Sequence, residues 1–176
     1  GFQEPLQIKS LLEGIPRSRF YQAFSREGRE RLDTLMPKIL QQCLASEYPD
    51  TALTRSIFLI QSIGRRSAYL ALLSENPLAL SQLVRLVCAS SEISQWIAKH
   101  PVILDELLDP IATFQVKDRL EITQELRTKM ERAETDLEAG MEVLREFRQA
   151  YTLRVAAADI AGLIDTKTVA LSLSAL

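Results

Sequence analysis

The stretch LREFRQAYTLRVAAADIAG, residues 144–162, decides how the chain folds. Its first half is basic and aromatic, whereas its second half consists mostly of small residues. Side chains that recur every three or four positions share one side of an α-helix, and here these positions hold Tyr151, Val155, Ala158 and Gly162. Because small side chains let a neighbouring helix approach closely, the stretch predicts a helix that buries this side against another helix.

The charged residues of this stretch need a separate explanation. Arg145, Arg148 and Arg154 fall largely on other sides of the helix. Asp159 stands among the small residues, where a carboxylate needs a cation beside it. We expect Asp159 to pair with Arg154, with Lys167 or with an arginine of another helix. Arg148, Arg154 and Asp159 are therefore candidate contacts with a partner or an adjoining domain.

The preceding residues, 117–148, extend the helical pattern toward the N-terminus. They include 7 basic and 9 acidic side chains, a charge density that is typical of the solvated face of an amphipathic helix. Pairs four residues apart, such as Glu125 and Lys129, each add about 0.2–0.5 kcal/mol. We expect the longest helix to run roughly from Thr135 to Leu163. The apolar stripe is predicted to pass through Leu126, Met130, Ala133, Leu137, Met141, Leu144, Tyr151, Val155, Ala158 and Gly162.

The rest of the chain also has helical periodicity. Asn76 and Pro77 are placed to begin one helix, and Ser90 or Ser91 to begin the next. A long segment from Ser18 to Ala45 is expected to break or kink near Pro37, and Gly64 to mark a bend or a close helix contact. We predict an all-α fold, a bundle of about seven to nine helices joined by short loops.

Composition limits the class of protein. The 176 residues and 47% hydrophobic content fit a single helical domain, residues 1–176, with a subdivision into 1–110 and 111–176 as the alternative. A net charge of -2 argues against a nucleic-acid partner. No apolar run reaches the roughly 20 residues of a membrane span. Two isolated cysteines, Cys43 and Cys88, suggest buried thiols in a reducing compartment, so we expect a cytoplasmic protein without membrane contact.

One acidic cluster invites a catalytic interpretation. Glu134, Asp136 and Glu138 resemble the paired carboxylates of a two-metal site, but residues two apart point in different directions on a helix. We favour a capping box in which Thr135 is the N-cap and Glu138 lies three residues on, with Asp136 in the first turn. The only histidine, His100, precedes Pro101 at a predicted helix end, where a structural role is expected. We therefore predict no catalytic residue, no cofactor-binding residue and no metal ligand.

A second acidic cluster lies in DELLDP, residues 105–110. Asp105 and Asp109 are four residues apart and would share a face of an α-helix, where they repel each other unless a cation lies opposite. Asp105, Glu106 and Asp109 therefore form either an exposed edge, an internal ion pair or a contact with a partner.

Two long motifs resemble a known family. They are GRRSAYLALLSENPLALSQLVRLVCASSEISQWIAKHPVILDELLDP, residues 64–110, and the stretch LREFRQAYTLRVAAADIAG. Both are similar to the helical region of bacterial glutamine synthetase adenylyltransferase, the bifunctional enzyme that adds AMP to glutamine synthetase and removes it. The resemblance implies two nucleotidyltransferase domains, each with a Gly-Ser and Asp-x-Asp metal site that uses ATP and Mg²⁺. LRVAAADIAG is more similar to the segment before the second, adenylylating domain.

The family's catalytic pattern is missing from this sequence, since Gly-Ser followed by Asp-x-Asp occurs nowhere. The start at Gly1 and the apolar pattern that still runs in TKTVALSLSAL suggest a piece of a larger protein. The resemblance then implies the central region, tied to regulation by the nitrogen signal protein PII and by glutamine. Its other partners would be the adjoining nucleotidyltransferase domains and glutamine synthetase. The alternatives are a scaffold of the adenylylating active centre that contacts glutamine synthetase, and a generic helical adaptor.

Overall fold

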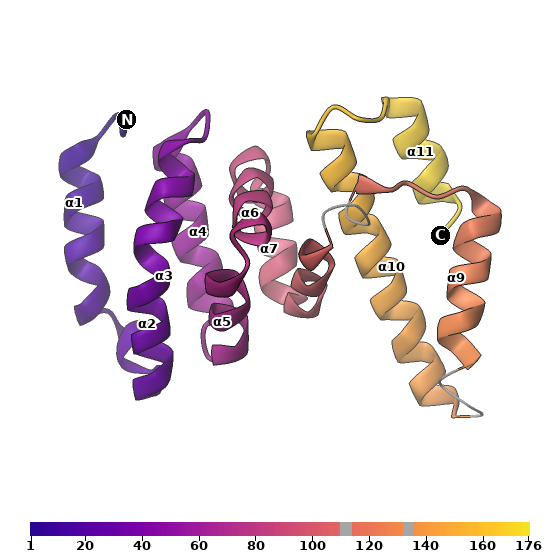
Figure 1. Ribbon diagram of the computed structural model, residues 1–176, viewed down its shortest axis with the longest axis horizontal. Helices are drawn as coiled ribbons and strands as arrows, with labels where there is room; N and C mark the ends of the chain where they lie inside the picture. Colours follow the sequence, from indigo (N-terminus) through magenta and orange to yellow (C-terminus); the bar gives the residue numbers. More distant parts are fainter. Residues whose placement is uncertain (110–113, 132–135) are drawn as a thin grey trace. The chain divides into compact units, whose positions relative to one another are not determined.

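The protein is seen in a computed structural model that describes residues 1–109, 114–131 and 136–176. These residues form ten α-helices and two 3₁₀ helices, and no strand occurs among them (Figure 1). The all-α prediction is confirmed, with one α-helix more than the expected upper count. The chain divides into two compact units, Gly1–Leu104 and Asp105–Leu176. None of the described helices combines the length and apolarity that a bilayer span requires.

The first unit is built from seven α-helices and a 3₁₀ turn. In chain order they are α1 (Pro5–Gly14), η1 (Ile15–Arg17), α2 (Arg19–Gln22), α3 (Arg26–Leu44), α4 (Pro49–Ile63), α5 (Ser67–Glu75), α6 (Pro77–Ala89) and α7 (Ser91–Lys99). Helix α4 packs against α3, α6 and α7, and it carries a long run of buried side chains. Such near-continuous burial explains why its sequence, with SIFLI at its centre, looks apolar on more than one face.

The long segment from Ser18 to Ala45 is interrupted at a different place from the one expected. Helix α3 continues through Pro37, so the expectation of a break there is wrong. The interruption lies before Ser25, whose hydroxyl accepts a hydrogen bond from the Gly28 amide at 3.1 Å and caps α3. Burial of Leu35 and Ile39 on either side of the proline supplies packing that offsets the missing backbone hydrogen bond.

Gly64 ends α4 at a close contact, as the sequence predicted. A Cβ atom added at this residue would lie 2.0 Å from Cζ of Phe24. Phe24 is itself buried, so its ring occupies the space that a side chain would need. Glycine is required here by volume and not by backbone conformation, because the φ angle of -67° is ordinary.

The second unit consists of three described α-helices. They are α9 (Arg119–Glu131), α10 (Leu137–Ile160) and α11 (Thr166–Ser174), and α9 and α11 both pack against α10. Its core is a cluster of Ile122, Phe147, Tyr151 and Val155, against which Val116, Leu126, Ile164, Val169 and Ala175 pack. The 3₁₀ helix η2 (Pro101–Leu108) leads into this unit along the chain.

Helix α10 is the longest described helix, and its C-terminal half is packed as the sequence predicted. Tyr151, Val155 and Ala158 are all at most 1% exposed. Gly162 does not continue this face, which corrects the predicted stripe. It adopts a φ of +71° beyond the helix end, and the amide of Leu163 donates to the carbonyl of Ala158 at 2.9 Å. Gly162 therefore terminates α10 in a left-handed C-cap.

The N-terminal half of α10 corrects two further expectations. The stripe is not buried there, because Leu137, Met141 and Leu144 are 79%, 50% and 46% exposed. The N-cap is Asp136, whose Oδ1 accepts from the Glu138 amide at 2.9 Å, and not the predicted Thr135. Thr135 and Glu134, like Ala133 of the stripe, lie outside the described residues. The helix nevertheless starts within two residues of the expected position.

Candidate functional site

The most distinctive feature of the second unit is a buried arginine. Arg154 is 7% exposed, and it is the only charged side chain in the buried class among the described residues. Its Nε donates to Oε2 of Glu106 at 2.7 Å, and its Nη1 to Oε2 of Glu125 at 3.4 Å. Arg154 therefore lies inside the second unit, with Glu106 and Glu125 as partners. A guanidinium that meets two carboxylates is neutralised inside the protein, which offsets the large cost of its desolvation.

Glu125 connects this arginine to two lysines. Its Oε2 accepts from Lys117 Nζ at 2.7 Å, and its Oε1 lies 3.9 Å from Lys129 Nζ. Burial alone would raise the pKa of Glu125, but the hydrogen bond from Lys117 and the nearby positive charges outweigh burial and lower it. We call Glu106, Arg154, Glu125 and Lys117 the ionic network. Its members come from η2, α10, α9 and the segment before α9, so it fastens these elements together.

The Tyr151 hydroxyl adds a second set of polar contacts beside the apolar cluster. It donates to the carbonyl of Lys117 at 2.8 Å and accepts from the amide of Lys117 at 3.0 Å. Burial raises the pKa of Tyr151. The phenol therefore holds the segment before α9 against α10, and its oxygen both donates and accepts in these structural contacts.

The acidic cluster of DELLDP is divided by the structure. Glu106 points into the ionic network, whereas Asp105 and Asp109 are exposed. They do not share a face as expected, because η2 is a 3₁₀ helix with three residues per turn and ends at Leu108. Partial burial and the adjacent charge of Glu106 raise the pKa of Asp105. Of the three acids, one makes an internal ion pair and two remain at the surface.

The other two candidates lie at the surface of α10. Arg148 is exposed on this helix, in agreement with its predicted position. Asp159 is exposed as well, and the pairing with Arg154 is not formed, because Arg154 is occupied by Glu106 and Glu125. Arg145 is also exposed and lies 2.6 Å from Glu142 in a surface ion pair. The structure thus leaves Arg148 and Asp159 outside the ionic network.

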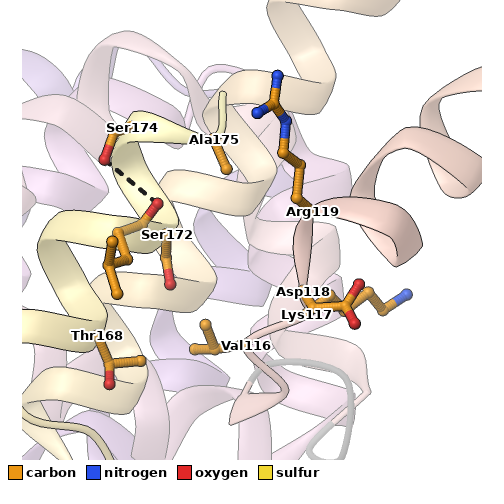
Figure 2. Close-up of a pocket in the computed structure, with 9 residues that line it drawn as sticks. Val116, Lys117, Asp118, Arg119, Thr168, Ser172, Ser174 and Ala175 are labelled. Atoms are coloured by element: carbon orange, nitrogen blue, oxygen red, sulfur yellow. Dashed lines mark hydrogen bonds between the residues drawn. The ribbon is translucent and has the colours of Figure 1, made fainter.

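An open cavity of about 570 Å³ lies between the start of α9 and α11. Figure 2 shows residues 116–119 on one side and side chains of α11 on the other. Val116, Leu171 and Ala175 contribute apolar lining, and Thr168, Ser172 and Ser174 contribute hydroxyls. Two titratable side chains of the lining already have partners, since Lys117 Nζ lies 2.7 Å from Glu125 Oε2 and Asp118 Oδ1 accepts from the Glu121 amide at 2.9 Å.

No metal site is formed by the described parts of the chain, in which no three His, Cys, Asp or Glu side chains gather as ligands. His100 is the C-cap residue of α7, where its backbone amide donates to the carbonyls of Ile97 and Trp96, and its ring lies edge-on to Trp96. The geometry of the second unit therefore supports holding and positioning of elements.

The sequence analysis missed the network partners Glu125 and Lys117. Glu125 was assigned only a surface pair with Lys129, and this pair is confirmed but is its longest contact. The signal that pointed to the network was Arg154 itself, an arginine between Leu153 and Val155 in an apolar context. Its partner Glu106 is 48 residues away in the chain, a separation at which helical periodicity carries no information.

Comparison with known proteins supports the resemblance found in the motifs. Residues 80–176 match the family model described as glutamate-ammonia ligase adenylyltransferase. The bifunctional glutamine synthetase adenylyltransferase/adenylyl-removing enzyme of Thioalkalivibrio sulfidiphilus is 43% identical over 165 residues, which are 93% of this chain and 17% of that protein. The protein of the same description from Pseudomonas putida is 43% identical over 163 residues, 92% of this chain and 17% of its own length.

A third relative matches the whole chain. The bifunctional glutamine synthetase adenylyltransferase/adenylyl-removing enzyme of Idiomarina loihiensis is 36% identical over 177 residues, which cover 100% of this chain and 19% of that protein. The chain thus spans less than a fifth of the length of the relatives it matches. Since the family model covers more than half of the residues, the chain belongs to the glutamate-ammonia ligase adenylyltransferase family.

Proposed function

We propose that this chain is the central helical region of a bifunctional glutamine synthetase adenylyltransferase and that it couples effector signals to the catalytic domains. The signals are the PII protein and glutamine, and the enzyme controls glutamine synthetase by adding AMP from ATP and removing it. The region itself carries no active site. It acts by contacting the adjoining nucleotidyltransferase domains in ways that differ between the two activities.

The observation that carries this proposal is the combination of family membership with a missing catalytic pattern. Between 91% and 100% of the chain aligns with the relatives, yet the aligned part is at most 19% of each of them. Gly-Ser followed by Asp-x-Asp is absent from the sequence. ATP and Mg²⁺ therefore have no fitting donor set here, and we assign them to other parts of the longer enzyme.

The geometry of the second unit supports a coupling role. Coupling between two sites requires an element that makes different contacts in two states. The ionic network holds η2 against α10 through Glu106, while Asp105 and Asp109 stay at the surface beside it. These two acids are suitable for testing, because their replacement leaves the buried core intact.

The test uses the full-length enzyme with the double substitution Asp105→Ala and Asp109→Ala. We expect the PII or glutamine concentration for half-maximal response to shift by about five- to thirty-fold, which corresponds to a coupling change of ~1–2 kcal/mol. The effector-saturated rate of AMP transfer should stay within a few fold. As a matched control, Glu131→Ala with Glu146→Ala removes two exposed acids of the same unit and should leave the midpoint unchanged.

The second candidate function is a scaffold of the adenylylating active centre that contacts glutamine synthetase. The exposed apolar side chains of Leu137, Met141 and Leu144 on α10 favour it, because such residues commonly pack against a partner. The same experiment separates the two candidates. A collapse of the saturated rate with an unchanged effector midpoint would contradict the coupling proposal and favour the scaffold.

A further inference from the structure

The element that joins the two units along the chain has an unusual conformation. Helix η2 is a 3₁₀ helix of eight residues, whereas such helices rarely exceed three or four residues because their hydrogen bonds are poorly aligned. Its own hydrogen bonds therefore hold it weakly. Three apolar side chains are buried along it, namely Ile103, Leu104 and Leu107.

A strong polar contact holds the second half of η2. Oε2 of Glu106 lies 2.7 Å from Nε of Arg154, and the side chains are 18% and 9% exposed. Charge-assisted bonds of this length are about twice as strong as neutral ones. The neighbouring carboxylate of Asp105 opposes this arrangement, because its pKa is raised by partial burial and by the charge of Glu106. The ion pair that holds η2 is thus strong, but the negative charge of Asp105 repels its carboxylate.

The ionic network also contains a substitute for Glu106. Oε2 of Glu125 lies 3.4 Å from Nη1 of Arg154, so the guanidinium keeps a carboxylate partner when Glu106 moves away. A buried charge left without any partner is strongly destabilising. Because Glu125 remains beside Arg154, the guanidinium avoids this cost when Glu106 moves away. Lys117 lies at 2.7 Å from the same Glu125 oxygen and stays in place through the backbone contacts of Tyr151. The network therefore has two arrangements in which Arg154 is paired.

We infer that the Glu106–Arg154 ion pair is a latch that closes η2 onto α10 and opens without unfolding the second unit. In the open arrangement, Glu106 is solvated and Arg154 pairs with Glu125 alone. Residues 105–108 of η2 then leave the 3₁₀ conformation, whose own hydrogen bonds hold it weakly. The latch lies beyond the proposed function, since it concerns a conformational change of this chain that occurs with or without an effector.

Amide hydrogen exchange of the 176-residue chain, read by mass spectrometry, tests the latch. Glu106→Gln keeps the size of the side chain but removes its charge, and Arg154→Lys keeps the charge but cannot bridge both carboxylates. For both variants we expect exchange of amides 103–108 to become about tenfold faster or more. Exchange within α10 and α11 should remain unchanged. Glu142→Gln, which breaks the surface pair with Arg145, is the matched control and should change neither region.

Each other outcome overturns the latch. Unchanged exchange at residues 103–108 would mean that Glu106 does not hold η2. Exchange that rises equally in η2, α10 and α11 would show that the Glu106–Arg154 pair stabilises the whole unit and not η2 alone. Loss of the fold in both variants, seen by circular dichroism, has the same meaning, because a latch must open while the unit stays folded. No effector or glutamine synthetase is present, so this result is independent of the proposed function.

Discussion

Gly64 is a residue at which a single methyl group decides the packing. A Cβ atom there would meet Cζ of Phe24 at 2.0 Å and the carbonyl oxygen of Ile60 at 2.7 Å. The ring is buried and the carbonyl belongs to the backbone, so neither gives way easily. Gly64→Ala should therefore lower the free energy of unfolding by about 1–3 kcal/mol, measured from the urea midpoint.

Gly14→Ala is the control for this prediction. Nothing lies within 4 Å of a Cβ atom at Gly14, which is the last residue of α1. Alanine should be neutral or stabilising there by up to about 1 kcal/mol, because it reduces the freedom of the unfolded chain. Equal effects of the two substitutions would refute the packing argument for Gly64.

Glu125 predicts how the stability of the second unit depends on pH. Its pKa in the folded protein is lowered, since the contacts with Lys117, Arg154 and Lys129 outweigh burial. A carboxyl with a lowered pKa stabilises the fold fully above its unfolded-state pKa of about 4.3. This contribution is lost as the pH falls through the folded-state pKa.

The measurement compares urea midpoints of the wild-type chain and Glu125→Gln from neutral pH downward. The difference between them should be constant above the unfolded-state pKa and shrink in more acidic solution, where protonated Glu125 resembles glutamine. Glu131→Gln, at an exposed acid of the same helix, should show only a small difference throughout. A difference for Glu125→Gln that persists unchanged in acid would show that its charge is not what stabilises the unit.

At the scale of elements, α10 organises the second unit because both α9 and α11 pack on it. Its side chains change character along the helix, from exposed apolar residues near Leu137 to fully buried small residues near Ala158. The neighbouring helices account for this change. Tyr151 and Val155 lie in a core that also contains Ile122 before them in the chain and Val169 after them.

Ala158→Leu tests how closely these helices approach. Ala158 is completely buried, so three additional carbon atoms have no space without movement of a neighbouring helix. We expect a loss of about 1–3 kcal/mol in the free energy of unfolding, seen as a lower denaturant midpoint. Ala170→Leu, at an exposed position of α11, is the control and should have little effect. An unchanged midpoint for Ala158→Leu would mean that no neighbouring helix packs closely against this face of α10.

At the scale of the whole molecule, we predict that the chain alone transfers no AMP. Nucleotidyl transfer needs carboxylates positioned around Mg²⁺ and a grip on the triphosphate, and the sequence lacks the Gly-Ser and Asp-x-Asp pattern that would supply them. Incubation with labelled ATP, Mg²⁺ and glutamine synthetase should leave the synthetase unlabelled. Label that appears, and vanishes on Asp136→Ala or Glu134→Ala, would refute the assignment of Asp136 as a cap.

Local sequence patterns were sufficient for the helical class and for several packing positions. Periodicity predicted the burial of Tyr151, Val155 and Ala158, and hydroxyl placement predicted the cap at Ser90. The family was also recognisable in the sequence, because the two long motifs, residues 64–110 and 144–162, are similar to those of the family. All of these features depend on residues within one or two helical turns, or on the motif itself, so no knowledge of distant contacts was needed.

Tertiary structure alone decided the ionic network and the exposed half of α10. Periodicity placed Arg154 away from the packing side, but the carboxylates that pair with it in the interior, Glu125 and Glu106, are 29 and 48 residues away in the chain. The apolar pattern around Leu137 predicted burial, yet burial requires a covering element, and the end of α9 lies against Gly140 instead, where an added Cβ atom would be 3.3 Å from Cε of Met130. A helical pattern determines which residues share a face, and the partners that fold onto that face determine whether it is buried.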